Sequence, residues 1–486
     1  MNSIGPRPRE LRAWALLTTL AFAAGNAAAA LPREVGRAFL DAGVPLTAVG
    51  IVVQEVTKSK PLFSQLPDRP FNPASVMKLV TTFAALELLG PEFHWTTAAY
   101  LDGPLDAGVL RGNLVLKGGG DPKITLERWQ AFMAALRDKG LTAVEGDLVL
   151  DRSFFAPVAH DAGAFDGEPL KPYNVGPDAL LVNFKSVKFG FSPGAAADTA
   201  AGTVEPSLRA IALSAPPKLA PGPCGDWRAT IGASFIDQGT RAEAAFAGRY
   251  PASCGERDWW VSLLDHPTYV HGMFDTYFRA AGGRFAGRWT DGVAPALATP
   301  FATLDSPPLW DVVRDINKLS NNVMARQLFL TLATVRAPPP ATTARATQTV
   351  QDWLAQKNLR MPELVLDNGS GLSRRERISA GSLARLLVAA DGSRVRDEFA
   401  SSLSVAAMDG TLTRRFTNGS VAGQALLKTG TLDGVRALAG YVIDNEGRRF
   451  AVVAVVNHAN SARAQGALDY LVQWVYRNGA SWRPPR

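Results

Sequence analysis

Strand-like segments at the two ends of the chain constrain the fold more than any other feature. The expected strands lie over residues 46–56, 61–66, 425–431, 435–443 and 450–456. Turn residues at 432–434 and 444–447 separate the last three. We expect all five to share one antiparallel sheet with helices around it, including a last helix over residues 462–476. The sequence therefore predicts an α+β fold whose two halves are far apart in the chain.

A serine and a lysine three residues apart follow the early strands. Ser75 and Lys78 form the one Ser-x-x-Lys tetrad of the chain. Asn72 and Pro73 are an N-cap residue and a first-turn proline, and Gly90 is a natural helix end. We expect a helix over residues 74–89, with Ser75 in its first turn and Lys78 on the same face. A hydroxyl beside an amine can be activated in this way without a histidine.

Two short motifs later in the chain give the tetrad a context. Ser320-Asn321-Asn322 is a Ser-x-Asn triplet, and Lys428-Thr429-Gly430 is the one Lys-Thr-Gly. Three such elements in this order resemble the active-site set of the penicillin-recognising serine enzymes, which include β-lactamases and penicillin-binding proteins. The middle motif of that family often reads Ser-Asp-Asn, and Asn321 takes the central place here.

The spacing of the motifs narrows the resemblance. Ser320 follows Ser75 by 245 residues, far more than a compact β-lactamase domain needs. An insertion of this size is similar to the class C low-molecular-mass penicillin-binding proteins, the D-alanyl-D-alanine carboxypeptidase/endopeptidases. Further segments that carry the resemblance are Tyr173-Asn174, Ala179-Leu180 with Asn183, Asp367 with 370–374, 409–412 and 438–441.

The resemblance implies a transpeptidase/β-lactamase-like domain, a five-stranded antiparallel sheet with flanking helices, formed by residues 31–94 and 296–486. Residues 95–295 differ in composition from the rest of the chain. Short strand-like runs such as 114–116 and 148–150 alternate there with loops rich in Gly, Pro and Ala. We expect these residues to form a β-rich insertion of two small subdomains.

The resemblance also implies a substrate, the D-alanyl-D-alanine end of a peptidoglycan stem peptide, and a catalytic role for three residues. Ser75 is expected to attack the D-alanyl carbonyl and form an acyl-enzyme. Lys78 is expected to take the serine proton, with its pKa lowered by burial and by the nearby charge of Lys428. Ser320 is expected to pass a proton to the leaving amine.

Other motif residues suit substrate binding. Asn322 can hydrogen-bond both Lys78 and the substrate amide. Lys428 and Thr429 suit the terminal carboxylate, one by its charge and one by its hydroxyl. Gly430 has no side chain, so a substrate backbone can approach the strand edge.

The backbone N–H groups of Ser75 and Thr431 are expected to form an oxyanion hole. β-Lactam antibiotics are then expected to acylate Ser75 as covalent inhibitors. The alternative interpretation treats each motif singly, with the serine triplet as a helix cap and Lys428 as a charge at a strand edge.

The N-terminus predicts export. Three arginines precede an apolar stretch over 13–24, and residues 27–30 are small, as in a cleaved signal peptide over 1–30. Twelve apolar residues are too few to span a bilayer. We therefore expect a periplasmic protein without a transmembrane anchor. The net charge of +7 allows loose association with an anionic envelope, whereas export and scattered arginines argue against nucleic acid.

Cysteine and histidine usage is sparse. Cys224 and Cys254 are the only cysteines, and in an exported protein they predict one disulfide, with two free thiols as the alternative. The five histidines show no zinc-ligand spacing, so no metal or other cofactor is expected.

Two rival functions stay open at this point. A β-lactamase usually carries a water-activating glutamate, and no Glu-x-x-x-Asn segment lies between the first two motifs. A non-catalytic penicillin-binding scaffold would use the motifs for binding alone, although Ser75, Lys78 and Lys428 are all intact. The favoured function is a serine DD-peptidase that removes a terminal D-alanine, cuts a cross-link, or does both.

Overall fold

A computed structural model describes residue 1 and residues 30–157, 159–194, 199–479 and 481–483. The signal peptide expected over 1–30 lies outside the described residues except for its two end residues. Across the described ranges, no helix combines the length and the apolar character needed to cross a bilayer.

A six-stranded sheet joins the two ends of the chain. Its order is β2-β1-β24-β23-β22-β21, and each neighbouring pair is antiparallel. The strands are β1 (Val49–Glu55), β2 (Phe63–Gln65), β21 (Ser404–Val405), β22 (Ala425–Leu432), β23 (Val435–Ile443) and β24 (Arg449–Asn457). The α+β fold is confirmed, but the expected count of five strands is wrong. Strand β21 has two residues, too few to show any periodicity.

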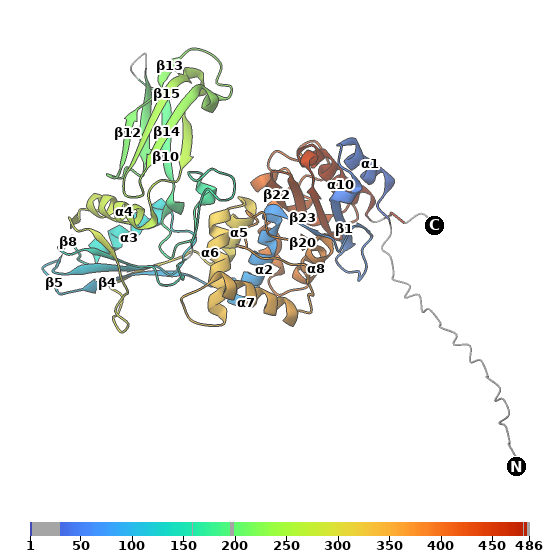
Figure 1. Cartoon of the computed structure of the whole chain (residues 1–486), viewed down its shortest axis with the longest axis horizontal. Helices are drawn as coiled ribbons and strands as arrows, with labels where there is room; N and C mark the ends of the chain where they lie inside the picture. Colours follow the sequence, from blue (N-terminus) through green and yellow to red (C-terminus); the bar gives the residue numbers. More distant parts are fainter. Residues whose placement is uncertain (2–29, 158, 195–198, 480, 484–486) are drawn as a thin grey trace.

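Side chains at alternate positions of the sheet pack into two separate hydrophobic cores. In β24, Val452, Ala454 and Val456 pack with α1 (Arg33–Asp41) and α10 (Gln465–Asn478). Ala451, Val453 and Val455 point the other way, into a core shared with α2 (Lys78–Leu89) and α8 (Ala380–Asp391). Both faces of the sheet are therefore covered by helices, as Figure 1 shows on its right-hand side. The long apolar runs of β23 and β24 follow from this double burial.

Helix α2 lies at the centre of the helical layer. It is surrounded by α5 (Leu309–Lys318), α6 (Asn322–Thr331), α7 (Thr343–Gln356) and α9 (Arg396–Ser401). Every residue of α2 from its start to Leu86 is buried, as expected for a helix that is apolar all round. The expected single helix over 74–89 is wrong at its start, because Ala74–Met77 form a 3₁₀ turn before α2 begins. Gly90 ends α2 with φ of 85°.

The long segment between α2 and α5 forms two groups of strands. The first group holds sheets of order β18-β9-β7-β4-β19 and β17-β8-β6-β5, with two helices packed on them. Its elements are β4 (Thr96–Asp102), β5 (Leu105–Asp106), β6 (Val109–Leu110), β7 (Asn113–Lys117), α3 (Leu126–Asp138), β8 (Ala143–Val144), β9 (Leu148–Asp151), α4 (His266–Ala280), β17 (Arg284–Phe285), β18 (Trp289–Asp291) and β19 (Ala302–Asp305). Because β19 pairs with β4, this sheet runs ten residues past the expected end of the insertion.

The second group rises away from the first in Figure 1. It holds a sheet of order β11-β10-β16 and a sheet in which β15 pairs with β12, β13 and β14. Its elements are β10 (Val187–Pro193), β11 (Ala200–Glu205), β12 (Ile211–Ala215), β13 (Lys218–Ala220), β14 (Ile231–Asp237), β15 (Ala242–Pro251) and β16 (Arg257–Val261). Cys224 and Cys254 form a disulfide in this group, with Cα atoms 4.7 Å apart.

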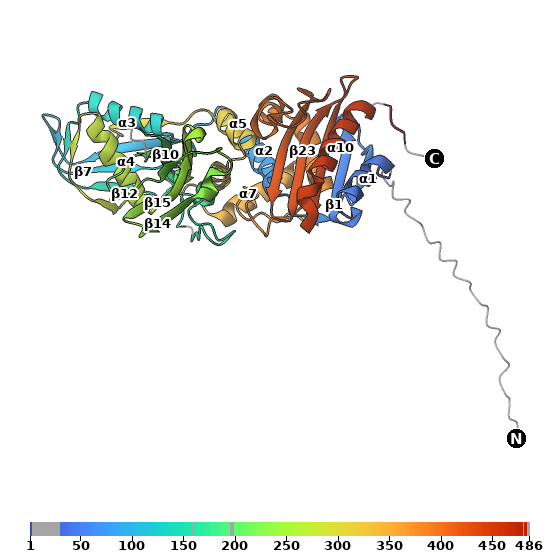
Figure 2. The ribbon, with the colours of Figure 1, turned by 90° about the horizontal axis from the view of Figure 1, so that it is seen from above.

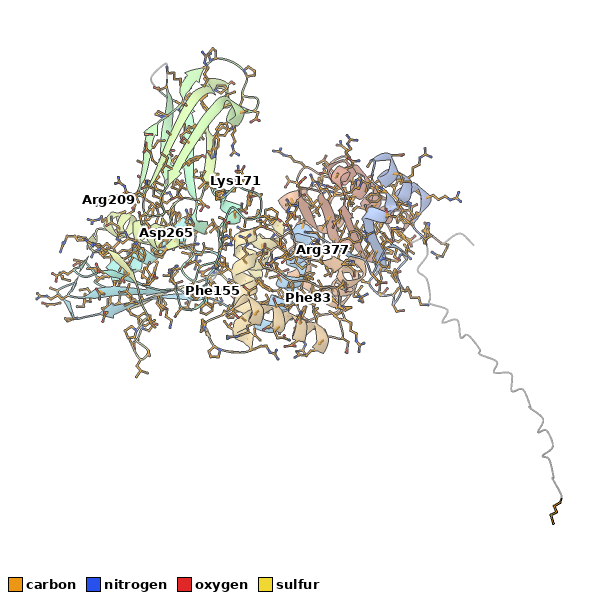
Figure 3. The ribbon with its side chains drawn as sticks, in the orientation of Figure 1. Phe83, Phe155, Lys171, Arg209, Asp265 and Arg377 are labelled. Carbon is orange, nitrogen blue, oxygen red and sulfur yellow. A yellow bond between two sulfur atoms is a disulfide. The ribbon has the colours of Figure 1, made fainter. Side chains whose placement is uncertain are left out.

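The inserted segment is anchored to the rest of the molecule, the half that holds the six-stranded sheet and its helices (the sheet half). Phe155 from the insertion and Phe83 from α2 belong to one buried cluster, and Figure 3 marks both. On α6, the Gln327 side chain accepts from Asp178 N–H at 3.0 Å and donates to its carbonyl at 2.8 Å. Seen from above in Figure 2, the insertion and the sheet half follow one another along the long axis. These contacts fix the position of the inserted strands beside the motifs.

Candidate active site

The 3₁₀ turn before α2 brings Ser75 and Lys78 together. In such a turn, side chains three residues apart lie directly above one another. Lys78 Nζ donates to Ser75 Oγ at 3.0 Å, to Asn322 Oδ1 at 2.6 Å and to the Ser370 carbonyl at 2.5 Å. Lys78 is fully buried, whereas Ser75 is partly exposed. The amine is thus held by three acceptors, one of which is the candidate nucleophile.

The surroundings of Lys78 favour its neutral form. Burial is the largest cause that lowers the pKa of Lys78 well below its usual value, and the charge of Lys428 is the second. The Arg326 guanidinium lowers this pKa further, whereas the Glu376 carboxylate raises it. A neutral Lys78 keeps two protons for Asn322 and Ser370, and its lone pair is then free to accept the Ser75 proton.

Lys428 lies on β22 and binds the serine triplet. Its Nζ donates to Ser320 Oγ and to the Thr429 carbonyl, each at 2.9 Å. Burial lowers the pKa of Lys428 to about 7. The two lysines therefore bind the two ends of the triplet, Ser320 on one side and Asn322 on the other.

The middle of the triplet has a structural task. Asn321 caps α6, because its Oδ1 accepts from Met324 N–H at 3.0 Å. Ser320, just before it, has a positive φ of 57°, which turns the chain between α5 and α6. The helix-cap interpretation is thus true of Asn321 alone, while its two neighbours face the lysines.

Strand β22 presents an open edge to the nucleophile. Strand β21 pairs with Leu426 and Leu427, and the described strands leave the same edge unpaired from Lys428 onward. Thr429 Oγ1 donates to Thr411 Oγ1 at 2.9 Å, so Thr411 joins the site although its role was not foreseen. Thr431 is exposed and lines the same cleft as Ser75.

Glycine is needed at position 430 because the turn before α2 packs against it, whereas the sequence suggested that it leaves room for a substrate backbone. A Cβ at this position would lie 2.6 Å from the Pro73 carbonyl and 3.1 Å from the Ala74 side chain. The space that glycine leaves is therefore filled by the turn that carries Ser75. Close packing of β22 on this turn fixes the distance between the strand edge and the nucleophile.

The loop over 367–376 carries part of the family resemblance, but no role in the site was predicted for it. Its Ser370 carbonyl binds Lys78, and Gly371 packs so closely that a Cβ there would lie 2.0 Å from the Ala74 carbonyl. Glu376 holds this loop, since its Oε1 accepts from three consecutive backbone N–H groups at 3.3, 3.1 and 2.9 Å. Its Oε2 is buried without a partner among the described residues. Burial raises the pKa of this carboxyl group.

A cleft of about 620 Å³ opens over the nucleophile. The sheet half contributes lining residues from all three motif regions, namely Ser75, Ser320, Asn322 and Thr431. The insertion contributes three further lining residues, Phe165, Asp166 and Tyr173. The cleft therefore has one wall from each part of the chain.

The disulfide lies away from this cleft, because Cys224 and Cys254 belong to the second group of strands and do not line it. Among the residues that the structure describes, no group of three His, Cys, Asp or Glu side chains could hold a metal ion. The eight motif residues named for catalysis and binding all lie around the cleft or on the strand edge beside it.

Comparison with known proteins agrees with this geometry. The D-Ala-D-Ala carboxypeptidase 3 (S13) family profile matches residues 33–477. A D-alanyl-D-alanine carboxypeptidase of Actinomadura sp. is 29% identical over 474 residues, covering 93% of this chain and 85% of the relative. D-alanyl-D-alanine carboxypeptidase DacB of Haemophilus influenzae is 26% identical over 414 residues, covering 79% and 80%.

A solved structure shows the same fold. The crystal structure of penicillin-binding protein 4 (dacB) from Haemophilus influenzae superposes with a TM-score of 0.77 at 21% identity. The match covers 91% of this chain and 99% of that structure. The profile match spans nearly the whole described chain, and it includes all three motifs of the cleft. This chain therefore belongs to the D-Ala-D-Ala carboxypeptidase 3 (S13) family of serine peptidases.

Proposed function

We propose that this protein hydrolyses D-alanyl-D-alanine bonds of peptidoglycan stem peptides through an acyl-enzyme on Ser75. One observation carries the proposal: a fully buried Lys78 amine lies 3.0 Å from Ser75 Oγ. A serine hydroxyl needs a base within hydrogen-bond reach, and a desolvated lysine can be that base. The division predicted from the sequence, with residues 31–94 and 296–486 as the catalytic domain and 95–295 as the inserted subdomains, is compatible with this function once the insertion is extended to the end of β19 at Asp305.

The reaction proceeds in two steps. Ser75 Oγ attacks the D-alanyl carbonyl while Lys78 takes its proton, and the N–H groups of Ser75 and Thr431 stabilise the oxyanion. The C–N bond then breaks as Ser320 gives its proton to the leaving amine, and Lys428, whose Nζ donates to Ser320 Oγ at 2.9 Å, restores the Ser320 proton. In the second step, water attacks the ester and gives up a proton to the now neutral Lys428. Lys78 returns the first proton to Ser75 as the acyl group leaves.

Recognition of the substrate rests on the strand edge. Lys428 supplies a charge and Thr429 a hydroxyl for the terminal carboxylate. Thr411 Oγ1 lies 2.9 Å from Thr429 Oγ1. When Thr429 turns its one proton to the carboxylate, Thr411 can donate to Thr429 in turn and so hold that hydroxyl in place. Asn322 orients both the Lys78 amine and the substrate amide.

β-Lactams are proposed as covalent inhibitors of the same serine. They place a strained amide carbonyl and a carboxylate where the substrate has its own. Support comes from the Haemophilus influenzae protein, which has also been solved in complex with a β-lactam. We further propose export to the periplasm by the segment 1–30, with loose attraction of a basic surface to the envelope.

The test is covalent labelling by a fluorescent β-lactam, run beside D-alanine release from a D-Ala-D-Ala peptide. Ser75→Ala should abolish both while leaving the thermal unfolding curve unchanged. Ser401→Ala is the matched control, because this exposed serine on α9 lies outside the cleft. Labelling of the Ser75→Ala protein would contradict the proposal.

The same measurements separate the rival functions. Labelling of the wild type without peptide cleavage would indicate a binding scaffold. Rapid release of hydrolysed β-lactam from the wild type would indicate a β-lactamase. A stable label together with D-alanine release supports the DD-peptidase.

A further inference from the structure

A second cavity borders the catalytic cleft, and no step of the proposed reaction uses it. This arginine pocket has a volume of about 580 Å³ and lies between the insertion, α6 and the loop over 367–376. Phe165, Leu372 and Arg374 line both the pocket and the cleft. The Arg374 guanidinium lies 4.8 Å from the centre of the Phe165 ring. This stacked pair therefore forms the wall between the two spaces.

A buried arginine faces the arginine pocket. Arg326 on α6 lines the cavity although it is only 6% exposed. Its Nη1 donates to the Val175 carbonyl at 2.9 Å. Burial lowers the pKa of Arg326 to about 10, so the guanidinium keeps its charge at neutral pH. A buried charge is costly unless a counter-charge offsets it.

The acidic groups near Arg326 are engaged by other partners. Asp367 accepts from Ser373 Oγ at 2.7 Å and forms an ion pair with Arg375. Glu376 Oε1 accepts from three backbone N–H groups. The ion pairs among the described residues leave Arg326 out, so these two carboxylates act on its pKa only from a distance. The N–H groups that Arg326 does not give to Val175 can therefore bind a ligand.

The rest of the lining indicates an organic anion with a single negative charge. Three arginines and two aspartates line the pocket, which leaves one positive charge. Burial lowers the pKa of His160, so its ring adds no charge at neutral pH. Phe329 and Leu330 supply an apolar wall, as in most small-molecule sites. A guanidinium binds a carboxylate through two parallel hydrogen bonds, so a carboxylate with an apolar body fits best.

A ligand in this pocket would influence the base through its charge. Three charged groups act on Lys78 from the elements around it: Lys428 and Arg326 lower its pKa, whereas Glu376 raises it. A carboxylate beside Arg326 offsets one of the two positive charges, so Lys78 holds its proton to higher pH. Acylation then slows wherever Lys78 is partly protonated.

We propose that the arginine pocket binds a small organic carboxylate at Arg326, and that this ligand slows acylation of Ser75 by offsetting the charge beside the base. The effect on acylation rests on the proposed function, in which Lys78 is the base, whereas the binding does not. No bond forms or breaks in the pocket. The ligand is therefore a regulator and not a substrate.

Calorimetric titration of the full chain with 4-phenylbutyrate tests the binding, with the uncharged 4-phenylbutyramide as the control ligand. The wild type should bind the carboxylate and not the amide. Arg326→Met removes the charge and should weaken binding at least about tenfold, the scale of a lost charge-assisted hydrogen bond.

Two further variants make the result specific. Ala164→Trp fills the pocket from an exposed position and leaves Arg326 in place. It should weaken binding as well, and it keeps the test valid if Arg326→Met fails to fold. Arg385→Met is the matched control, since Arg385 is exposed on α8 and lines neither space. It should bind as the wild type does.

Two measurements separate the pocket from the cleft. Titration is repeated after a β-lactam has acylated Ser75 and filled the cleft, and binding should persist. The limiting acylation rate at saturating β-lactam is then measured on the acid limb of its pH profile. Saturating 4-phenylbutyrate should lower this rate about threefold, the order of change that one nearby charge imposes on a protonation equilibrium. Arg326→Met and Ala164→Trp should show no such fall.

Each other outcome would overturn the inference. A wild type that binds neither ligand, or both equally, would rule out a carboxylate site, as would undiminished binding in both pocket variants. Binding that is lost on acylation would place the carboxylate in the cleft instead. Binding without any change in the limiting rate would refute the influence on Lys78. Failure of the proposed function is distinguishable, because the β-lactam would then leave Ser75 unlabelled even without 4-phenylbutyrate, while the calorimetric result would stand.

Discussion

Lys428 should give the enzyme a pH dependence that differs between two kinds of substrate. Burial lowers the pKa of Lys428 to about 7, so it loses its charge within an accessible range. Only the charged form can pair with a terminal carboxylate. For a D-Ala-D-Ala peptide, kcat/KM should therefore fall on the alkaline side. A matched ester or thioester that lacks the carboxylate should show no such fall.

The size of the effect follows from the pKa. With a value near 7, roughly half of Lys428 is protonated at pH 7, about one-tenth at pH 8 and about one-hundredth at pH 9. Above pH 8, kcat/KM for the peptide should thus drop about tenfold per pH unit. The acid side of both profiles belongs to Lys78, which must be neutral to act as the base and whose pKa is lowered by burial and by the Lys428 charge. The ratio of the two substrates isolates Lys428.

Lys428→Ala should change both the acid limb and the alkaline limb of the pH profile of kcat/KM. Without a like charge nearby, Lys78 keeps its proton to higher pH, so the acid limb moves to higher pH for both substrates. The alkaline fall disappears for the peptide, whose KM rises about 10- to 150-fold through loss of a charged hydrogen bond worth roughly 1.5–3 kcal/mol. The KM of the ester should change little.

The assay is steady-state release of D-alanine or of the alcohol between pH 5 and 10 at constant ionic strength. Equal alkaline limbs for both substrates in the wild type would refute the carboxylate role. An unmoved acid limb in Lys428→Ala would refute the influence on Lys78. If neither effect is found, Lys428 is only a buried strand charge.

Three further predictions concern the base, its counter-charge and the disulfide. Lys78→Arg should slow β-lactam acylation at least about 100-fold, since arginine cannot act as the base; a wild-type acylation rate would rule Lys78 out. Glu376→Gln keeps an oxygen that accepts from the loop N–H groups but removes the charge that raises the pKa of Lys78. The acid limb of the pH profile of acylation should therefore move to lower pH, and a shift to higher pH would contradict this. Replacing Cys224 and Cys254 together by alanine should lower the free energy of unfolding by about 3.6 kcal/mol, from loop closure over a separation of 30 residues. Denaturant unfolding measures this, while acylation of Ser75 should persist because the disulfide lies outside the cleft.

Local pattern was enough to predict the strands of the catalytic sheet. The segments expected at 425–431, 435–443 and 450–456 are β22, β23 and β24, with ends correct to one residue. Their apolar runs and the tight turns between them are properties of neighbouring residues, so they can be read along the chain. The motif residues were found because three short patterns in this order resemble the active-site set of a known family.

Features that depend on contacts between distant residues could not be predicted. The third acceptor of Lys78 is the Ser370 carbonyl, and a backbone group leaves no mark on residue identity. Glu376 looks like any charged loop residue until the fold buries it beneath three N–H groups. The two-residue strand β21 exists only because β22 offers it an edge.

The sequence by itself thus determined which residues the proposed chemistry uses: a candidate serine nucleophile, its proposed lysine base and a second lysine, each in a recognisable local motif. The tertiary structure alone decided what surrounds that chemistry. Burial set the pKa values of Lys78 and Lys428, since desolvation depends on how the whole chain packs. The hydrogen bonds of Gln327 on α6 with the backbone of Asp178 likewise placed the insertion beside Ser320, because a contact across 149 residues of sequence is settled by the folded chain and not by neighbours in it.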